Sequence, residues 1–205
     1  MDIDQVLTRG VAQILPTKKG LADLMAKRKI SLYEGFDPTS PSLHIGHLIG
    51  IRKLAQFQKL GHQVIFLIGD FTGMIGDPTD KTATRQKLTH EQMLSNLKSY
   101  QNQVKNIIDF KGENPVKIVF NYDWLSKLNF TDVVELAAHF TVQQMIERDF
   151  YQERLKANKP IYLHEFLYPL MQGYDSAQLA VDLEIGGNDQ MFNLLAGRTL
   201  EKAYK

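Results

Sequence analysis

Apolar side chains along this sequence follow two spacings, one typical of helices and one typical of strands. Continuous or alternating apolar residues predict strands at 30–36, 63–69, 116–122 and 179–185. Helical spacing predicts helices at 3–15, 20–28, 45–60, 89–109, two between 131 and 157, one at 163–172 and a last one after 190. Helices that alternate with strands at these distances predict an α/β domain with a largely parallel sheet.

Local signals indicate where several of these helices begin. Thr89, followed three residues later by Gln92, has the pattern of a capping box. Thr131 and Thr141 are candidate N-caps for the two helices that end near Ala157. These positions divide the middle of the chain into short helical segments.

Three loops follow predicted strands, at 37–44, 70–86 and 186–190. In open parallel sheets, ligands bind beyond the carboxyl ends of the strands. We therefore expect the chemistry of this protein to lie in these three loops.

Composition narrows the class of protein. The 205 residues suit one domain, and 43% hydrophobic residues supply a sizeable core. The absence of cysteine excludes disulfides, cysteine–zinc sites and a cysteine nucleophile. No apolar run is long enough to span a membrane and the N-terminus is polar, so we expect a soluble, cytoplasmic protein. A net charge of +1 does not favour a polyanion-binding surface over the whole chain.

The stretch FDPTSPSLHIGHLIG places His44 and His47 where a loop turns into a helix. Zinc motifs on helices need histidines four residues apart with a glutamate between them, so metal binding is not favoured. Two polar residues at an exposed helix start would also give this pattern. Gly46 and the free N–H groups of the helix N-terminus favour a phosphate site instead, with both imidazoles as additional donors.

Six blocks of sequence together resemble bacterial tyrosyl-tRNA synthetases, a family of class I aminoacyl-tRNA synthetases. They are YEGFDPT, the HIGH block FDPTSPSLHIGH, GMIGDPTDK, NYDWL, YPLMQGYD and IGGNDQ, in the order of the family, from about residue 30 to 198. HIGH alone also occurs in other nucleotidyltransferases, and the set of six blocks is more specific. The resemblance implies a Rossmann-like nucleotide-binding domain with an inserted helical region at about 123–160.

The resemblance also implies the reaction and its participants. The family activates L-tyrosine with ATP and Mg²⁺ to form tyrosyl-adenylate, which is then transferred to tRNA(Tyr). The nucleophile is the substrate carboxylate, so no serine or cysteine nucleophile is needed, and no metal is expected to be held by protein ligands alone. The relatives are homodimers, and the apolar segment 130–146 is a candidate interface.

Site residues carry over from the family by position. The catalytic set is expected to be Thr39, His44, His47, Lys81 and Arg85. Tyrosine is expected to contact Tyr33, Thr72, Asp77, Tyr168, Gln172, Asp175 and Gln190. ATP is expected to contact Asp37, His44, Gly46, His47, Gly187 and Asp189. In this scheme Tyr33 and Asp175 bind the substrate phenol, and Asp189 binds ribose.

The sequence departs from the family in two respects. Glu34 and Glu184 replace residues that are uncharged in the relatives. The KMSKS segment does not occur, so we expect residues 1–205 to be a catalytic domain truncated before that segment and lacking the anticodon-binding region. Such a chain would bind substrates and turn over poorly. The alternatives are another HIGH-type nucleotidyltransferase, or a fragment that binds tyrosine without catalysis.

Overall fold

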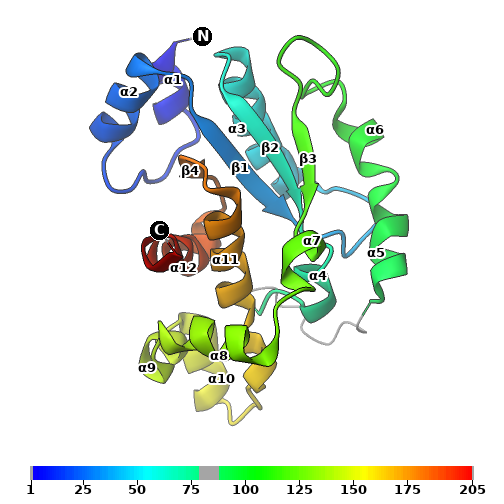
Figure 1. Cartoon of the computed structure of the whole chain (residues 1–205), viewed down its shortest axis with the longest axis vertical. Coiled ribbons are helices and arrows are strands. Elements are labelled where there is room, and N and C mark those ends of the chain that lie inside the picture. Colours follow the sequence, from blue (N-terminus) through cyan, green and yellow to red (C-terminus); the bar gives the residue numbers. More distant parts are fainter. Residues whose placement is uncertain (1, 79–87, 205) are drawn as a thin grey trace.

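The computed structural model describes residues 2–78 and 88–204. Within these residues, four parallel strands form one sheet in the order β3-β2-β1-β4 (Figure 1). The strands are β1 (Ser31–Phe36), β2 (Gln63–Ile68), β3 (Lys117–Phe120) and β4 (Leu183–Glu184). The predicted α/β class with a parallel sheet is confirmed.

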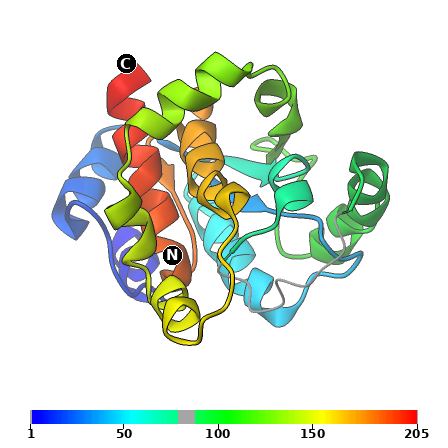
Figure 2. The same ribbon diagram turned by 90° about the horizontal axis from the view of Figure 1, so that it is seen from below.

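The helices connect the strands and cover both faces of the sheet (Figures 1 and 2). They are α1 (Ile3–Thr8), α2 (Lys18–Lys27), α3 (Ile45–Lys59), α4 (Thr72–Ile75), α5 (His90–Leu97), α6 (Tyr100–Val104), α7 (Tyr122–Leu125), α8 (Phe130–Ala138), α9 (Val142–Ile146), α10 (Asp149–Lys156), α11 (Tyr168–Leu179) and α12 (Met191–Tyr204), with 3₁₀ turns η1 (Leu163–Phe166) and η2 (Asn188–Gln190).

Side chains of β1 alternate between the two faces of the sheet, as strand geometry requires. Leu32 and Phe36 pack into the large cluster that includes residues of α1, α2 and α3. Tyr33 packs with Ile65 and Leu67 into a smaller cluster on the other face, which Leu179 of α11 joins. The sheet therefore presents Tyr33 toward α11 and its neighbours on β1 toward α3.

Two predicted helices are shorter or divided. The helix expected at 3–15 ends at Thr8, because Gly10 has a φ of 67° and cannot continue it. The helix expected at 89–109 is split into α5 and α6. Around the break, Asn96 Nδ2 donates to Pro38 O at 2.8 Å and Tyr100 Oη donates to Ser40 O at 2.7 Å. The break lets both elements hold the loop that follows β1.

The strand predicted at 179–185 was mostly wrong. Leu179 is the last residue of α11, Ala180 adopts a left-handed conformation with φ 48°, and only Leu183–Glu184 pairs with β1. The alternating apolar pattern arose because Leu179 and Val181 pack on the sheet from outside it. The helix expected at 163–172 is likewise a 3₁₀ turn, η1, followed by the longer α11.

Helix caps follow the sequence signals with one exception. The Thr89 capping box is present, and Thr141 caps α9. Thr131 is not a cap: α8 begins two residues earlier than expected, where the Asn129 side chain accepts from the backbone N–H groups of Thr131 and Asp132. Asparagine is at least as favourable an N-cap as threonine, so residue type alone could not decide whether Asn129 or Thr131 caps α8.

Helices α11 and α12 make the most extensive contact between elements in the described part of the chain and lie side by side in Figures 1 and 2. Gly173 permits this approach. A Cβ atom at Gly173 would lie 3.0 Å from the Ala196 carbonyl carbon and 3.0 Å from Leu200 Cδ1. The contact fixes the position of α11, which carries three candidate site residues, relative to α12, which directly follows Gln190.

Candidate active site

The histidine pair forms the N-terminus of α3. His44 is the N-cap, and its Nδ1 accepts from Gly46 N at 3.2 Å. His47 Nδ1 accepts from His44 N at 3.1 Å, and the two rings stack with centroids 3.7 Å apart. A Cβ atom at Gly46 would come within 2.9 Å of the His44 ring, so this arrangement requires glycine.

These hydrogen bonds determine what the two rings can offer to a ligand. A neutral imidazole that accepts at Nδ1 carries its proton on Nε2, which is then a donor. Burial lowers the pKa of His47 to about 4, with a smaller contribution from His44. His47 is therefore neutral at pH 7 and acts as a hydrogen-bond donor without a full charge.

The loop after β1 brings Asp37 into the same region. Asp37 accepts from Thr72 Oγ1 at 2.7 Å and from Tyr168 Oη at 2.9 Å. A Cβ atom at Gly69 would lie 1.8 Å from Asp37 Oδ1, so glycine is required at this close approach. Burial raises the pKa of Asp37 to about 7, although both hydrogen bonds oppose the shift. Thr39 lies in the same loop, and its N–H donates to Asp37 O at 2.8 Å.

Asp175 on α11 is 2% exposed and is held by two donors. Trp124 Nε1 donates to Oδ1 at 2.7 Å and Asn121 Nδ2 donates to Oδ2 at 3.1 Å. Asn121 also donates to Thr72 Oγ1 at 3.0 Å, which joins this group to Asp37. Burial raises the pKa of Asp175 well above its ordinary value.

Tyr33 is held by a second group of polar side chains. Its hydroxyl lies 2.7 Å from Ser176 Oγ, and Ser176 Oγ donates to Glu184 Oε2 at 3.1 Å. Gln172 Nε2 donates to Glu184 Oε1 at 3.0 Å. No hydrogen bond joins Tyr33 to Asp175 in the described part of the chain. The two side chains expected at the substrate phenol therefore have separate protein partners. Burial raises the pKa of Tyr33 well above its ordinary value.

Gln190 connects the loop after β4 to the rest of the site. Its Nε2 donates to Asp77 Oδ2 at 2.8 Å and to Asp189 Oδ2 at 3.0 Å. A Cβ atom at Gly187 would lie 2.3 Å from Asp189 Oδ1, which explains why a glycine precedes this turn. The expected residues Lys81 and Arg85 lie outside the described residues.

Four carboxyl groups lie in or beside this region without an ion-pair partner among residues 2–78 and 88–204. None of the ion pairs found in the described ranges includes Glu34, Asp37, Asp175 or Glu184. Burial raises the pKa of Glu34 to about 8 and that of Glu184 to about 7. A Cβ atom at Gly50 would lie 2.0 Å from Glu34 Oε1, so the Glu34 carboxyl occupies space that the glycine leaves on α3.

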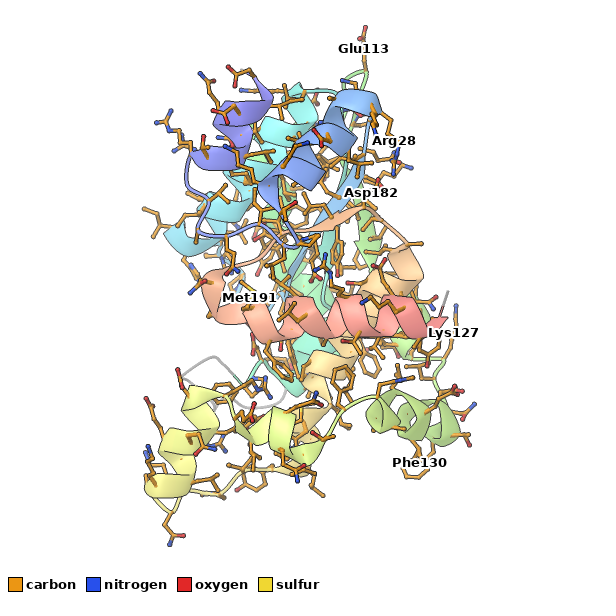
Figure 3. The ribbon with its side chains drawn as sticks, turned by 90° about the vertical axis from the view of Figure 1, so that its left-hand side faces the viewer. Arg28, Glu113, Lys127, Phe130, Asp182 and Met191 are labelled. Carbon is orange, nitrogen blue, oxygen red and sulfur yellow. The ribbon has the colours of Figure 1, made fainter. Side chains whose placement is uncertain are left out.

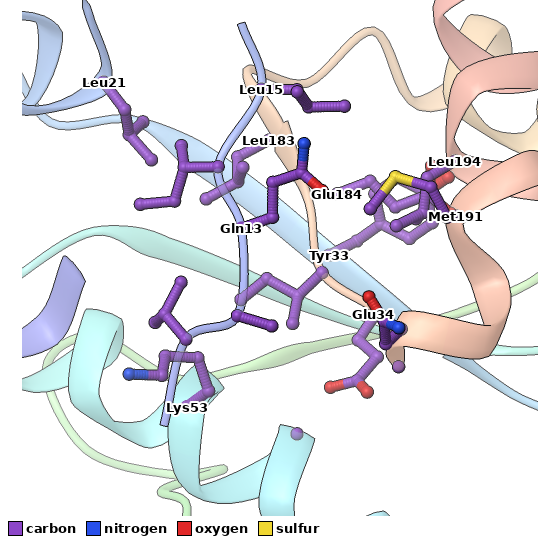
Figure 4. A pocket seen from close by; sticks show the side chains of 18 of the residues that line it. Gln13, Leu15, Leu21, Tyr33, Glu34, Lys53, Leu183, Glu184, Met191 and Leu194 are labelled. Carbon is purple, nitrogen blue, oxygen red and sulfur yellow. The ribbon is translucent and has the colours of Figure 1, made fainter. Parts of the chain in front are cut away.

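A cavity of about 530 Å³ opens beside β1 and β4 (Figure 4). The N-terminal segment, including Gln13 and Leu15, forms one side of it, while Glu34 and Glu184 lie on the other side. Its lining also includes these expected site residues: Tyr33, Gly46, Gly187 and Asp189. Within the described ranges the lining does not include Thr72, Asp77, Tyr168, Gln172 or Asp175. The structure thus places Tyr33 and three of the six expected ATP contacts, Gly46, Gly187 and Asp189, around one cavity.

Sequence reasoning missed four polar residues that hold the expected ones, namely Asn121, Trp124, Ser176 and Asn193. Asn121 and Trp124 occur in the NYDWL block and Ser176 directly follows YPLMQGYD, so their positions were visible without their partners. Nothing in the spacing of α12 distinguishes Asn193 from an ordinary helix residue.

The described residues contain neither a preformed metal cluster nor a membrane-spanning helix. No group of three or more His, Cys, Asp or Glu side chains there could hold a metal ion. No helix there is long and apolar enough to cross a membrane. Magnesium ions are usually held by one or two carboxylates together with substrate phosphates and water, so a preformed protein cage is not required.

Comparison with known proteins agrees with this geometry. The tyrosine–tRNA ligases of Carboxydothermus hydrogenoformans and Legionella pneumophila are each 50% identical to this chain, over 98% and 97% of it and 49% of their own length. The chain thus spans about half the length of these curated relatives.

Solved structures show the same fold. A C-terminally truncated mitochondrial tyrosyl-tRNA synthetase of Aspergillus nidulans matches with a TM-score of 0.85 and 26% identity, over 98% of this chain and 61% of that chain. The corresponding protein of Coccidioides posadasii matches with a TM-score of 0.81 and 28% identity, over 98% and 58%. The family model of the class I tRNA synthetases (W and Y) matches residues 25–205. This chain therefore belongs to the class I tRNA synthetases of the W and Y group.

Proposed function

We propose that this chain is the tyrosine-activating portion of a tyrosine–tRNA ligase, which uses ATP to convert L-tyrosine to tyrosyl-adenylate before transfer to tRNA(Tyr). The observation that carries the proposal is the 50% identity with tyrosine–tRNA ligases over nearly the whole chain. A cytoplasmic location, and the assignment of α7 to α10 as a helical insertion in a single catalytic domain, are parts of the same proposal.

The proposed tyrosine site lies between β1 and α11. The Tyr33 hydroxyl and the Asp175 carboxyl are both buried polar groups at the inner end, suited to the two hydrogen bonds of a phenol. Asp77, Tyr168 and Gln172 would hold the substrate ammonium, with Thr72 beside them. Asp37 accepts from Tyr168 beside this position and has a raised pKa, and a substrate ammonium nearby would favour its ionised form.

The proposed reaction needs no proton transfer. An oxygen of the tyrosine carboxylate attacks the α-phosphorus of ATP and forms a new O–P bond. The bond from that phosphorus to the oxygen bridging to the β-phosphate breaks, and this oxygen leaves with the electron pair as pyrophosphate. The chain therefore contributes by positioning the reactants and by donors directed at the phosphates.

The proposed donors are at the N-terminus of α3. The Nε2–H groups of His44 and His47 would bind phosphate oxygens, together with Thr39, Lys81 and Arg85. Asp37, Gly46, Gly187 and Asp189 would contact the adenosine, and Gln190 the tyrosine carboxylate. Mg²⁺ would arrive with ATP and neutralise part of the phosphate charge.

Tyrosine-dependent exchange of labelled pyrophosphate into ATP tests this function. With ATP and Mg²⁺ present, we expect exchange with L-tyrosine and none above background with the other nineteen amino acids. Exchange that depends on a different amino acid would indicate another nucleotidyltransferase. Tyrosine binding by calorimetry without any exchange would indicate a chain that binds and does not catalyse.

The proposal includes assembly into a homodimer. Phe130 and Val134 on α8 are 82% and 54% exposed, and Val142 on α9 is 64% exposed. Figure 3 shows Phe130 pointing away from the rest of the molecule. Exposed apolar side chains of this size are typical of an interaction surface.

A charge at Phe130 is expected to weaken this assembly. Light scattering should show dimers of the unaltered chain at tens of micromolar, a concentration at which specific interfaces are usually occupied. Phe130→Asp should shift the population to monomers, because an aspartate in an apolar interface is desolvated without a partner. Leu94→Asp, at an exposed leucine of α5, is the matched control and should leave the dimer intact. Monomers of the unaltered chain would contradict the proposal.

A further inference from the structure

Asn193 lies on α12, two residues after its first residue, Met191, and is 1% exposed. It has no expected role in substrate binding. Its Nδ2 donates at 3.0 Å to Gln172 Oε1 and at 2.9 Å to Gln190 Oε1. One buried amide therefore joins two glutamines that come from α11 and from the loop before α12.

Each glutamine is bound at its other end by carboxylate oxygens. Gln172 Nε2 donates to Glu184 Oε1, and Gln190 Nε2 donates to Asp77 Oδ2 and Asp189 Oδ2. A carboxylate oxygen accepts hydrogen bonds, and the structure places both glutamine NH₂ groups against the acids. Both glutamine carbonyl oxygens are then directed at the residue between them.

The residue between two carbonyl oxygens has to donate twice. The NH₂ group of asparagine does this, whereas aspartate would place acceptors against acceptors and leucine would leave both oxygens without a donor. Asn193 Oδ1 is buried and has no hydrogen-bond partner in the described part of the chain. The amide is thus oriented by its NH₂ group, at the expense of its own oxygen.

We propose that Asn193 is a positioning residue that fixes the amide orientation of Gln172 and Gln190, so that the Gln190 NH₂ group, which donates to Asp77 and Asp189 in the free chain, can exchange one of these acceptors for the substrate carboxylate. This inference rests on the proposed function, in which Gln190 faces that carboxylate and Gln172 lies near the ammonium. Without Asn193, each glutamine amide can turn over and present an oxygen where a donor is needed.

The test compares L-tyrosine with tyramine, which lacks the carboxylate, by calorimetry on the whole 205-residue chain. Asn193→Leu removes both donors and keeps an aliphatic side chain of similar size. We expect this substitution to lower the affinity for tyrosine about tenfold and the affinity for tyramine only about threefold, because tyramine has no carboxylate for Gln190 to bind. In a chain that already carries Gln190→Met, Asn193→Leu should lower the affinities for tyrosine and tyramine by the same factor, about threefold.

Controls separate positioning from general damage to the fold. Asn114→Leu replaces another amide, which bonds backbone carbonyls of Gln58 and His62, and should change neither affinity. If Asn193→Leu does not fold, Asn193→Ala removes the same donors without added volume. Equal losses for tyrosine and tyramine, or the same loss of tyrosine affinity in both Gln190 backgrounds, would overturn the inference and leave the proposed function standing. Failure of the unaltered chain to bind tyrosine would overturn both.

Discussion

Asp175→Ala is expected to weaken L-tyrosine binding at least about a hundredfold, which corresponds to roughly 2.7 kcal/mol. In the proposed site the Asp175 carboxyl accepts from the substrate phenol at a position that is 2% exposed. Alanine removes that acceptor and also leaves Trp124 Nε1 and Asn121 Nδ2 without their partner. Each buried donor left unpaired lowers the folding stability of the variant by about 1–3 kcal/mol, and the loss of the phenol's acceptor lowers tyrosine affinity. Calorimetric titration with tyrosine measures the loss directly.

Phenylalanine is the informative second ligand in that experiment. It has no hydroxyl, so its weak binding should change little on Asp175→Ala and the tyrosine preference should disappear. Asp123→Ala, at an exposed aspartate beside Trp124, is the matched control and should leave both affinities unchanged. An unchanged ratio of tyrosine to phenylalanine affinity in a folded Asp175→Ala chain would place the phenol elsewhere.

Gly173→Val is expected to destabilise the chain by about 3 kcal/mol. The Cβ atom alone would lie 3.0 Å from the backbone of Ala196 and 3.0 Å from Leu200 Cδ1, and valine adds two methyl groups to it. Backbone cannot move aside as a flexible side chain can, so α11 and α12 would have to separate. The gain in helix propensity over glycine offsets only about 0.3–0.5 kcal/mol.

Urea unfolding followed by circular dichroism measures this loss. Gln178→Val, at an exposed position on the same helix, tests the effect of a β-branched residue without the clash and should cost less than about 0.5 kcal/mol. Similar midpoints for Gly173→Val and the unaltered chain would show that the helices adjust more easily than their close contact implies.

A strand with a continuous apolar sequence could be predicted, whereas the two-residue strand β4 could not. The strand at 63–69 was recognisable because every residue of β2 after Gln63 is buried. β4 is only Leu183–Glu184. The apolar residues before it, Leu179 and Val181, pack against Tyr33, Ile65 and Leu67 without pairing with β1. Apolar spacing reports burial, so it could not tell a residue that pairs with β1 from one that packs against the sheet.

Site residues were predictable where one backbone feature fixes their position. The start of α3 was located from Gly46 and the two histidines, and His44 is indeed the N-cap. Partners of side chains were harder, because they depend on where distant elements meet. The sequence assigned Tyr33 and Asp175 to the same substrate phenol but did not name their protein partners, and the fold brings the Tyr33 hydroxyl to Ser176, one position beyond Asp175 on α11.

The position of β4 beside β1 has a consequence for how the chain acquires its structure during synthesis. The strand that completes this side of the sheet is made about 150 residues after its partner, since Leu32 and Tyr33 pair with Leu183 and Glu184. Until then β1 is an edge strand with unpaired backbone groups, which can pair with other chains. Contacts so distant in sequence also form slowly. A nascent chain on the ribosome would therefore expose this unpaired strand edge while the residues between β1 and β4 are made, and protection of that edge by chaperones would matter most just before α11 and β4 emerge.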